Sequence, residues 1–451
     1  MTINASNPQG WGRFPAAENQ VLGQPLSLED CAKSIADLVQ SRPSLLPRGM
    51  GRSYGDSCTN SGGGLLQTRS LDHLLAFDPT TGIIRCEAGV SFAEIIDFAL
   101  PRGFFLPVTP GTKFVTVGGA IANDVHGKNH HRAGNFGHHV TQFEILRSDG
   151  ARSLCSPSSN PDLFFATIGG LGLTGLITWA EFKVRPARGP YIDDETVKFN
   201  TLDDFFSISA ESEEPFEYTV AWIDCLASGK NLGRGLFYRG NHSERPAPAS
   251  HPSNLPRSPS FKPLVPVDLP SIFLNPVTLQ LANTLFYEKQ RSRLSRKTVH
   301  YDPFFYPLDA VIHWNKLYGH RGFVQYQLVV PMLDGGAAIR EILQRIAFAR
   351  MGSFLAVLKM FGKMPSLGMM SFPCEGVTLA LDFPMNGKPL LTLLDELDRI
   401  VIAAGGRVYL GKDARLSPAA FAAYYPQASQ FSKFVDPKFS SGLWRRVNGT
   451  R

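Results

Sequence analysis

The chain has 451 residues, of which 43% are hydrophobic and 19% are charged, and its formal net charge is +6 at pH 7. These proportions are typical of folded globular proteins and exclude an intrinsically disordered chain, and the length predicts two domains. The positive charge is modest for this length, so we expect no nucleic-acid partner; it suits an anionic ligand or an anionic membrane surface without requiring either.

The six cysteines lie far apart along the chain, and no two are closer than Cys31 and Cys58. Because no CxxC pair or zinc-type spacing occurs, we expect neither a disulfide framework nor a metal site, and a reducing compartment is favoured. Residues 1–14 contain no apolar core segment, and no uninterrupted apolar run of about 18 residues occurs. We therefore expect neither a signal peptide nor a transmembrane helix.

The first 190 residues alternate short β-branched runs with helical patterns. One helix is predicted after Ser27 and Asp30, which are typical of a helix start. A second is predicted after the strand-like residues 82–87, because Ser91 and Glu94 have the spacing of a capping box. The apolar faces of these helices comprise Cys31, Ile35, Leu38 and Val39 in the first, and Phe92, Ile95, Ile96 and Ala99 in the second.

Three glycine-rich stretches interrupt this half of the chain, at residues 47–56, 110–131 and 169–175. The first stretch approaches a dinucleotide-binding GxGxxG motif, but its third glycine comes one residue late and no long amphipathic helix follows. A loop of small residues with successive exposed N–H groups can still hold a pyrophosphate. This stretch therefore predicts an anion-binding loop and disfavours a Rossmann turn.

The second stretch ends in a cluster of His126, Lys128, His130 and His131. Its small residues allow backbone amides to approach a flat ring, and imidazoles or a lysine at its end can handle protons near neutral pH. The alternatives are metal binding, for which His126 and His130 have a spacing of four, or solvated surface histidines. No nearby cysteine or helical HExxH pattern supports the metal.

A second domain is predicted from Tyr191, where the glycine-rich stretches end and strand-like segments such as residues 218–224 and 322–331 occur. A helix is predicted near residues 335–350. Within this domain, residues 246–270 hold eight prolines, a density that disfavours helices and central strands. We interpret residues 241–270 as a proline-rich mobile loop.

An apolar segment, residues 271–287, comes directly after this loop and is followed by a basic cluster. Such a pair of segments suits an anionic membrane surface. The alternative is a core helix that ends in solvated cations, as helix C-termini often do, and the segment taken alone favours this alternative. The cations are Lys289, Arg291, Arg293, Arg296 and Lys297.

Several motifs occur together and in order along the chain: PRGMGRSYGD (47–56), TVGGAIANDVHGKNHH (116–131), IGGLGLTG (168–175), FYPLD (305–309), GFVQYQ (322–327) and GKD (411–413). With these motifs the chain resembles the vanillyl-alcohol-oxidase type of FAD-linked oxidoreductases, and within it the enzymes that oxidise polyprenyl-phosphoryl ribose. The resemblance covers nearly the whole chain outside the proline-rich loop. In residues 377–383, Thr378 and Ala380 stand where the mycobacterial enzymes carry asparagine and cysteine.

The resemblance implies an α+β fold, with an FAD-binding domain of the vanillyl-alcohol-oxidase (PCMH) type and an inserted antiparallel-sheet substrate domain. The expected divisions are residues 1–190 for FAD binding, 191–406 for the substrate domain, and 407–451 for a C-terminal return to the FAD domain. FAD should be bound non-covalently, because Arg52 stands near the position where covalently flavinylated relatives often carry histidine. The expected cofactor-binding residues are Arg48, Gly49, Met50, Gly51, Arg52, Ser53, Tyr54, Gly55, Pro110, Gly111, Thr112, Val117, Gly118, Gly119, Ala122, Asn123, His126, Gly172, Gly175 and Lys412.

The activity that the resemblance implies is oxidation of the C2 hydroxyl of a polyprenyl-phosphoryl-β-D-ribose to the 2-keto sugar, the first half of an epimerisation to the arabinose form. Lys412, His126 and Tyr54 are the expected catalytic residues, and either Lys412 or His126 handles the proton. The expected substrate-binding residues are Lys128, Trp222, Tyr306, Gln325, Gln327 and Lys359. Read without the family, Tyr306 and Trp222 are ordinary core aromatics.

The expected partners are the lipid-linked sugar substrate, an NAD(P)H-dependent short-chain reductase that completes the epimerisation, and a membrane surface contacted peripherally. The expected location is cytoplasmic, peripheral on the inner membrane, with the periplasmic face as the alternative. A soluble alditol or aldonolactone oxidase that uses oxygen is the second hypothesis for the function. A non-catalytic flavin-binding scaffold is the third, and it is disfavoured by the intact HGKNHH and Lys412 segments.

Overall fold

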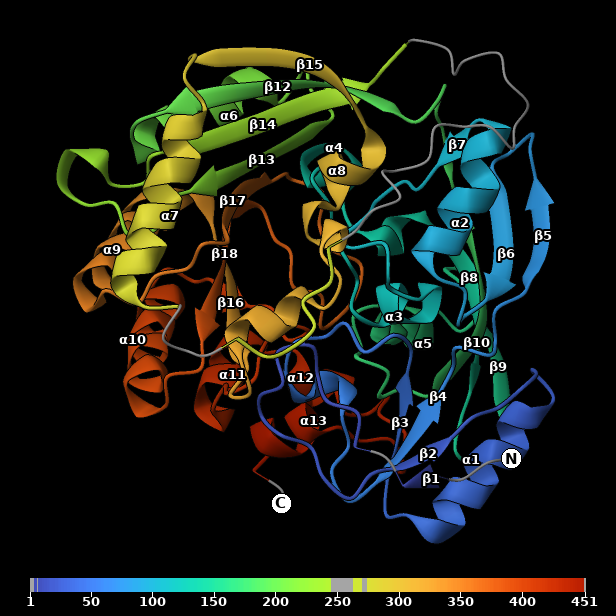
Figure 1. Ribbon diagram of the computed structural model, residues 1–451. Helices are drawn as coiled ribbons and strands as arrows, with labels where there is room; N and C mark the ends of the chain where they lie inside the picture. Colours follow the sequence, from blue (N-terminus) through green and yellow to red (C-terminus); the bar gives the residue numbers. More distant parts are fainter. Residues whose placement is uncertain (1–3, 6, 245–262, 270–273, 450–451) are drawn as a thin grey trace.

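The computed structural model describes residues 4–5, 7–244, 263–269 and 274–449 (Figure 1). The fold is α+β, with strands β1–β11 on one side of the molecule and strands β12–β19 in one large sheet on the other. The chain returns from the large sheet in three short C-terminal helices. No helix within the described ranges is long and apolar enough to span a bilayer.

Two sheets and one short strand pair build the first side of the molecule. In the four-stranded sheet β2, β4 and β3 run parallel, whereas β1 pairs with β2 in the antiparallel sense. The five-stranded sheet is antiparallel throughout. In spatial order the sheets are β1 (Asn4–Ala5), β2 (Val21–Gly23), β4 (Gly64–Gln67) and β3 (Leu45–Arg48); then β5 (Leu74–Asp78), β6 (Ile83–Glu87), β10 (Leu176–Lys183), β8 (Val140–Leu146) and β9 (Arg152–Cys155); and the pair β7 (Phe104–Phe105) with β11 (Arg185–Pro186).

The predicted helices of this side are present, and they pack as their patterns indicate. Helix α1 (Asp30–Ser41) buries three of the four expected residues, while Val39 is half-buried, and Ser27 Oγ accepts from the N–H of Asp30. Helix α2 (Phe92–Ala99) has the predicted capping box of Ser91 and Glu94 and buries its whole apolar face. The other helices here are α3 (Val117–Ala122), α4 (His130–Ala133), α5 (Pro161–Thr167) and the 3-10 turns η1 (Asp56–Cys58), η2 (Leu100–Arg102) and η3 (Phe136–His139).

The second side is an eight-stranded antiparallel sheet that contains the predicted strands at residues 218–224 and 322–331. Its last strand, Arg407–Val408, lies just beyond residue 406, where we expect the substrate domain to end. In spatial order the strands are β15 (Leu294–His300), β12 (Tyr191–Phe199), β14 (Gly235–His242), β13 (Tyr218–Ile223), β17 (Ala356–Phe361), β18 (Gly376–Pro384), β16 (Phe323–Val330) and β19 (Arg407–Val408).

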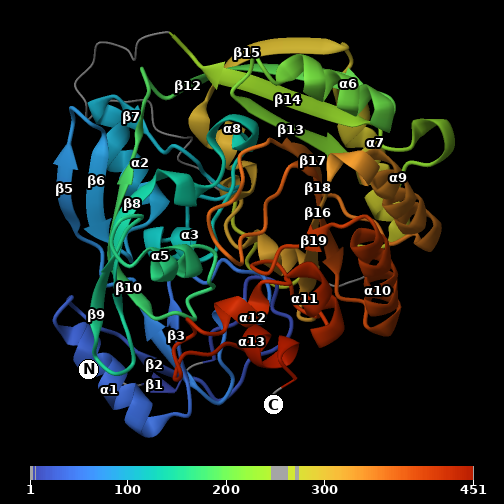
Figure 2. The same ribbon diagram turned by 180° about the vertical axis from the view of Figure 1, so that it is seen from behind.

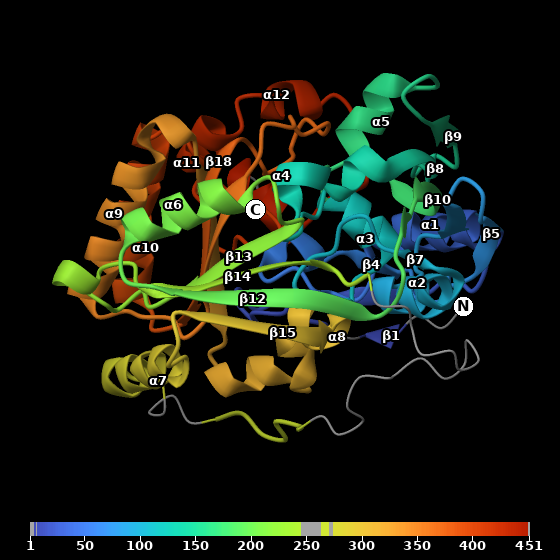
Figure 3. The same ribbon diagram turned by 90° about the horizontal axis from the view of Figure 1, so that it is seen from above.

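Helices cover the two faces of this sheet unequally. Helices α6 (Leu202–Ser212), α9 (Met332–Ala349) and α10 (Lys388–Ala403) lie on one face and bury the largest apolar core against it (Figure 3). On the other side lie α7 and the short helices and turns that follow the edge strand β15 (Figure 3). The latter elements are α7 (Pro276–Lys289), α8 (Tyr301–Phe305), η7 (Pro307–Ala310) and η8 (Trp314–Tyr318), and the remaining turn η4 (Gly229–Asn231) connects β13 to β14.

The C-terminal helices lie between the two sides of the molecule, at about the height of β3, and α11 lies next to α10 (Figure 2). Helix α11 packs against α10 and α13, and α13 packs against η1 of the first glycine-rich stretch. The helices are α11 (Pro418–Tyr424), α12 (Ala428–Phe431) and α13 (Gly442–Val447). Of the predicted proline-rich loop, residues 245–262 and 270 lie outside the described residues, and residues 241–242 belong to strand β14, which extends further than we predict.

Candidate active site

A cavity of about 890 Å³ lies between the glycine-rich stretches of the first side and the large sheet of the second. This volume is within the range of small-molecule sites, which are about 300–1,000 Å³. Residues of all three glycine-rich stretches line it, as do side chains of β13, β16 and β17. The cavity therefore brings together segments that are distant in the sequence.

One face of the large sheet forms a wall of this cavity because side chains alternate along a strand. On β16, Gln325 and Gln327 line the cavity, whereas Val324 and Tyr326 belong to the core under α9 and α10. Lys359 of β17 lines the cavity in the same way. Because of this alternation, the polar side chains of these strands face the cavity and the apolar side chains face the core.

The first glycine-rich stretch fits the diphosphate of a dinucleotide cofactor. Residues 48–54 line the cavity, and the backbone N–H groups of residues 50–53 donate to no acceptor within the described part of the chain. The half-buried guanidinium of Arg52 lies 4.0 Å from the ring centroid of Trp11. The Nε of Arg52 has no hydrogen-bond partner among the described residues. Successive N–H donors beside a cation are the donor set that a pyrophosphate needs.

The second and third glycine-rich stretches leave room for a flat ring. A Cβ added to Gly111 would meet no atom within 4 Å, so small residues keep the cavity open there. Helix α3 begins at its cap Thr116, whose Oγ1 accepts from Gly119 N–H, and this places Gly118 and Gly119 in the wall. Gly172 has a φ of 75°, a left-handed conformation that favours glycine.

His126 is buried among aromatic rings at the end of the second stretch, with 7% of its surface exposed. Its Nε2 lies 2.9 Å from Gln327 Nε2, and its Nδ1 has no partner within the described residues. Because an amide nitrogen only donates, Nε2 accepts and the proton of the neutral ring sits on Nδ1. Burial, and then the nearby Lys359, hold the pKa of His126 well below its usual value.

Lys412 enters the cavity from the turn after β19. Its Nζ lies 3.7 Å from the ring centroid of Tyr54, and the Tyr54 N–H donates to the carbonyl of Gly411 at 3.2 Å. Burial lowers the pKa of Lys412, and the carboxylate of Asp382 opposes part of that shift. Lys412 therefore holds its proton less tightly than an exposed lysine.

Lys128 and Lys359 make the cavity more positive. Lys128 Nζ donates to the carbonyl of Phe304, and Lys359 Nζ donates to the carbonyl of Gly127 at 3.4 Å. Burial lowers the pKa of Lys128 to about 8 and, together with the charges of Lys128 and Lys412, lowers that of Lys359 to about 7. Three half-buried lysines in the wall of one cavity favour an anionic ligand when they are protonated, because their charges repel one another.

Asp382 lies behind this cationic group on β18, directly opposite Gln325 in the strand register. It is fully buried, its Oδ1 accepts from Gln325 Nε2 at 2.5 Å, and its Oδ2 has no partner within the described residues. Burial raises the pKa of Asp382. The amide nitrogen of Gln325 points to Asp382, so its carbonyl oxygen is left as an acceptor, and the Tyr54 side chain is one group that hydrogen-bonds to Gln325.

The structure places most of the predicted site residues in the cavity wall. All three expected catalytic residues line it, as do five of the six expected substrate-binding residues. Tyr306 does not: its ring is buried and its hydroxyl lies 2.7 Å from Oγ1 of Thr109, which lines the cavity in its place. The members present are Lys412, His126, Tyr54, Lys128, Trp222, Gln325, Gln327 and Lys359.

Two expected cofactor-binding residues also lie behind the wall. Val117 is fully buried in the apolar core at the start of α3. Gly55 packs against the turn that carries Lys412, where an added Cβ would collide with the carbonyl oxygen of Asp413. The other expected cofactor-binding residues are all in the wall: Arg48, Gly49, Met50, Gly51, Arg52, Ser53, Tyr54, Pro110, Gly111, Thr112, Gly118, Gly119, Ala122, Asn123, His126, Gly172, Gly175 and Lys412.

Several wall residues are absent from the sequence-based predictions. Trp11 stacks on Arg52, Asp194 of β12 faces Lys128 and Lys297, and Phe286 of α7 packs against Trp222 of β13. None belongs to a glycine-rich motif. Strand alternation along β12 is the one signal that could have suggested Asp194, because it follows the buried Ile192 by two residues.

The histidine cluster does not converge on one point. His130 Nδ1 accepts from Gly362 N–H at 3.2 Å, and His131 Nε2 lies 3.0 Å from the carbonyl of Phe216. Together with the His126–Gln327 contact, these partners lie in different directions, which disfavours the metal alternative for this cluster.

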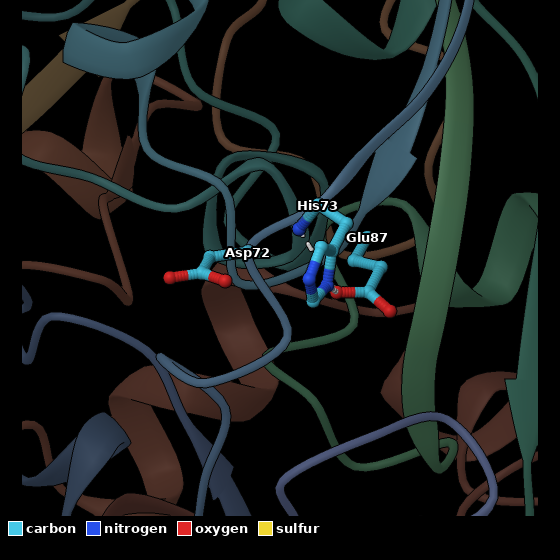
Figure 4. A group of neighbouring side chains, drawn as sticks. All are labelled: Asp72, His73 and Glu87. Atoms are coloured by element: carbon cyan, nitrogen blue, oxygen red, sulfur yellow. Dashed lines mark hydrogen bonds and ion pairs between the residues drawn. The ribbon is translucent and has the colours of Figure 1, made fainter.

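One group of side chains in the described residues has metal-ligand chemistry, and it lies outside the cavity wall. Asp72, His73 and Glu87 approach one another near the start of β5 and the end of β6 (Figure 4). His73 Nδ1 lies 2.8 Å from a carboxylate oxygen of Glu87, and the same oxygen accepts from the His73 N–H. Two of the three side chains therefore already satisfy one another as an ion pair.

Comparison with known proteins places the chain among flavoenzymes. The FAD binding domain family matches residues 20–156. The chain is 35% identical over 452 positions to the decaprenylphosphoryl-β-D-ribose oxidase of Mycolicibacterium smegmatis, covering 97% of this chain and 96% of the relative. It is 33% identical to an uncharacterised protein of Streptomyces coelicolor over 79% of this chain and all of the relative. It is 24% identical to the D-arabinono-1,4-lactone oxidase of Yarrowia lipolytica, over 51% of this chain and 43% of that enzyme.

Proposed function

The chain belongs to the decaprenylphosphoryl-β-D-ribose oxidase family of FAD-dependent oxidoreductases, and from this premise we propose its substrate and the roles of its residues. The proposed reaction is oxidation of the C2 hydroxyl of a polyprenyl-phosphoryl-β-D-ribose to the 2-keto sugar, the first half of an epimerisation to the arabinose form. The observation that carries the proposal is the group of half-buried lysines that faces the glycine-rich stretches across one cavity. A phosphorylated sugar supplies both the anion and the hydroxyl that such a site requires.

FAD is the cofactor, and its diphosphate would be held by the N–H groups and cations of residues 48–54. The flat ring would lie against the small residues of the second and third stretches. When bound, FAD supplies the acceptor for the hydride that leaves C2. We propose that FAD is bound non-covalently, because Arg52 cannot form a histidyl linkage; protein precipitated by acid should then release its yellow colour into the supernatant.

Lys412 is the proposed acceptor of the hydroxyl proton. Its lowered pKa allows a neutral amine to be present near neutral pH, and its Nζ already lies in the cavity beside Tyr54. His126 is a weaker choice, because its Nε2 already accepts from Gln327 and its low pKa disfavours a second proton. His126 and Gln327 would instead orient the sugar or the cofactor through Nδ1–H and the amide oxygen.

The other polar side chains would position the substrate. Lys128 and Lys359 would bind the phosphate, because both present ammonium groups to the cavity and no carboxylate of the described chain forms an ion pair with either. The Gln325 carbonyl oxygen, held outward by Asp382, would accept a sugar hydroxyl. Trp222 would pack against the sugar or the first isoprenoid unit.

Membership of the family also suggests a setting for the enzyme. The keto product requires a hydride donor to reach the arabinose form, so we propose an NAD(P)H-dependent short-chain reductase as the partner in the next step. A polyprenyl substrate resides in a bilayer, so we propose peripheral membrane contact, on the cytoplasmic face of the inner membrane or on its periplasmic face. We also propose that residues 1–190 with 407–451 bind FAD and that residues 191–406 bind the substrate.

The visible spectrum of the purified protein tests the proposed reaction. Under anaerobic conditions, addition of a polyprenyl-phosphoryl ribose in detergent should bleach the flavin band, whereas simple alditols should leave it unchanged. Bleaching by alditols and not by the lipid would favour the alternative, a soluble alditol or aldonolactone oxidase, for which the partial similarity to the Yarrowia lipolytica enzyme is the supporting observation. A flavin that no sugar reduces would favour a binding protein without oxidase activity.

A further inference from the structure

We infer that the outer face of α7 and the cations that follow it dock the protein onto an anionic lipid bilayer, next to the part of the cavity wall that α7 supplies. This inference rests on the proposed function in one respect: membrane docking serves the enzyme because the proposed substrate is linked to a lipid. The evidence for the surface itself is independent of the reaction.

Helix α7 exposes an apolar stripe. Val277, Leu281 and Leu285 recur every four residues and are 74%, 58% and 62% exposed. Leu279, with Asn283 and Tyr287, forms the buried face that holds the helix against the protein. The apolar residues of a core helix would face inward, so the structure disfavours the core-helix alternative for the part of this segment that α7 covers, whereas residues 271–273 lie outside the described residues.

The same helix reaches the cavity. Ala282, Asn283 and Phe286 line the cavity, and the Phe286 ring lies 4.7 Å from that of Trp222. Phe286 is also 43% exposed, so a single side chain links the outer stripe to the wall. An isoprenoid chain can therefore pass from a surface bound at α7 to the cavity along apolar side chains.

More apolar side chains extend the surface beyond the helix. Leu264 and Val267 are 54% and 64% exposed, in a segment that lies on the same side of the molecule as α7 (Figure 3). Val265 N–H donates to the carbonyl of Ile312, itself 42% exposed, which joins this segment to the turns after α8. Together these residues widen the stripe into a surface.

The positive charge beside this surface favours an anionic bilayer over a second copy of the chain as the partner. Lys289, Arg291 and Arg293 are exposed, and none forms an ion pair within the described ranges. The one acidic residue in this stretch, Glu288, pairs with Lys198. A second copy of the chain docked symmetrically would bring these cations together, whereas anionic headgroups neutralise them, at about 1 kcal/mol or fivefold in binding per cation.

Vesicle binding by the FAD-loaded protein tests the inference. The protein should sediment with vesicles of phosphatidylglycerol and phosphatidylcholine, and much less with phosphatidylcholine alone. The double variant Leu281→Asp, Leu285→Asp should bind at least about tenfold more weakly, because full burial of one leucine is worth a factor of roughly ten or more. The matched control is Leu333→Asp, Phe348→Asp on α9, which removes side chains that are 95% and 92% exposed, and it should bind normally.

Three outcomes would overturn the inference: no binding to anionic vesicles, equal loss in the α9 control, or unchanged binding of the α7 variant. A molar mass in solution that halves in the α7 variant would assign the surface to a second copy of the chain instead. Flavin reduction by the lipid substrate in detergent distinguishes failure of this inference from failure of the proposed function. The α7 variant should keep that reaction, and failure of the reaction in the unchanged protein would count against the substrate and not against vesicle binding.

Discussion

The lysines of the cavity and the cations that follow α7 carry the same charge in opposite surroundings. Lys128, Lys359 and Lys412 are half-buried in the wall of one cavity, and desolvation there lowers the pKa of each. Lys289 and Arg291 are exposed and keep their hydration. The difference shows that a cation becomes a proton carrier where water is removed, and a long-range attractor for anions where water remains.

Removal of Lys412 should have the largest effect, a loss in the rate of flavin reduction that removal of an exposed lysine does not cause. In Lys412→Met, the cavity loses the amine that we propose accepts the hydroxyl proton, and general-base catalysis is worth roughly 10²–10⁴-fold. Anaerobic stopped-flow measurement of flavin reduction should show a loss in this range while the flavin spectrum persists. Lys433→Met, at an exposed position of the C-terminal region, is the control. A loss of less than about tenfold would exclude Lys412 as the base.

Removal of Lys359 should stabilise the protein, and the gain should depend on pH. Its pKa is about 7 in the folded protein and 10.5 in a solvated lysine, so the unfolded chain binds more protons between these values. The contribution of Lys359 to the free energy of unfolding therefore rises with pH across that window. Lys359→Met should gain on the order of 1–4 kcal/mol below pH 7, and the gain should fade towards pH 10.

Thermal or urea unfolding of the FAD-loaded protein at several pH values measures this gain. Lys289→Met is the matched exposed variant, and its stability should change by less than about 0.5 kcal/mol at every pH. An equal gain for both lysines, or a gain that does not vary with pH, would show that the cavity does not lower the pKa of Lys359.

Replacement of Asp382 should alter the pH dependence of the reaction. Its carboxylate raises the pKa of Lys412, so Asp382→Asn should lower that pKa further and move the rise of the flavin-reduction rate to lower pH. An asparagine oxygen can still accept from Gln325 Nε2, so the orientation of that amide is retained. A uniform loss of rate without a shift of the profile would indicate that Asp382 acts only through packing.

The smallest expected effect is a difference in salt dependence between the cavity lysines and the exposed cations after α7. Between about 0.1 M and about 1 M salt the Debye length falls from about 10 Å to about 3 Å, which screens exposed charges more than buried ones. Vesicle binding should weaken severalfold over this range, whereas the affinity for the sugar phosphate in detergent should fall less. Equal weakening of the two would contradict the contrast between the buried and the exposed cations.

Much of the local structure could be predicted from short-range patterns. The capping box of Ser91 and Glu94 predicts a helix from residues close together in the sequence, and this helix is present, as is the helix predicted near residues 335–350. The glycine-rich stretches likewise indicated most of the cofactor side of the cavity, because close approach of backbone to a ligand demands small residues. Tyr306 shows the limit, since a family motif indicates proximity to a site and not direct contact.

The sequence by itself determined the helices, the strands, the glycine-rich loops and the identity of the polar residues, because these depend on neighbours along the chain. Only the tertiary structure decided that Lys128, Lys359 and Lys412 share one buried space, that Asp382 lies opposite Gln325, and that the apolar stripe of α7 faces outward. The physical reason is that desolvation, strand register and exposure depend on residues that lie from about fifty to more than two hundred positions apart, so a local sequence pattern does not contain them.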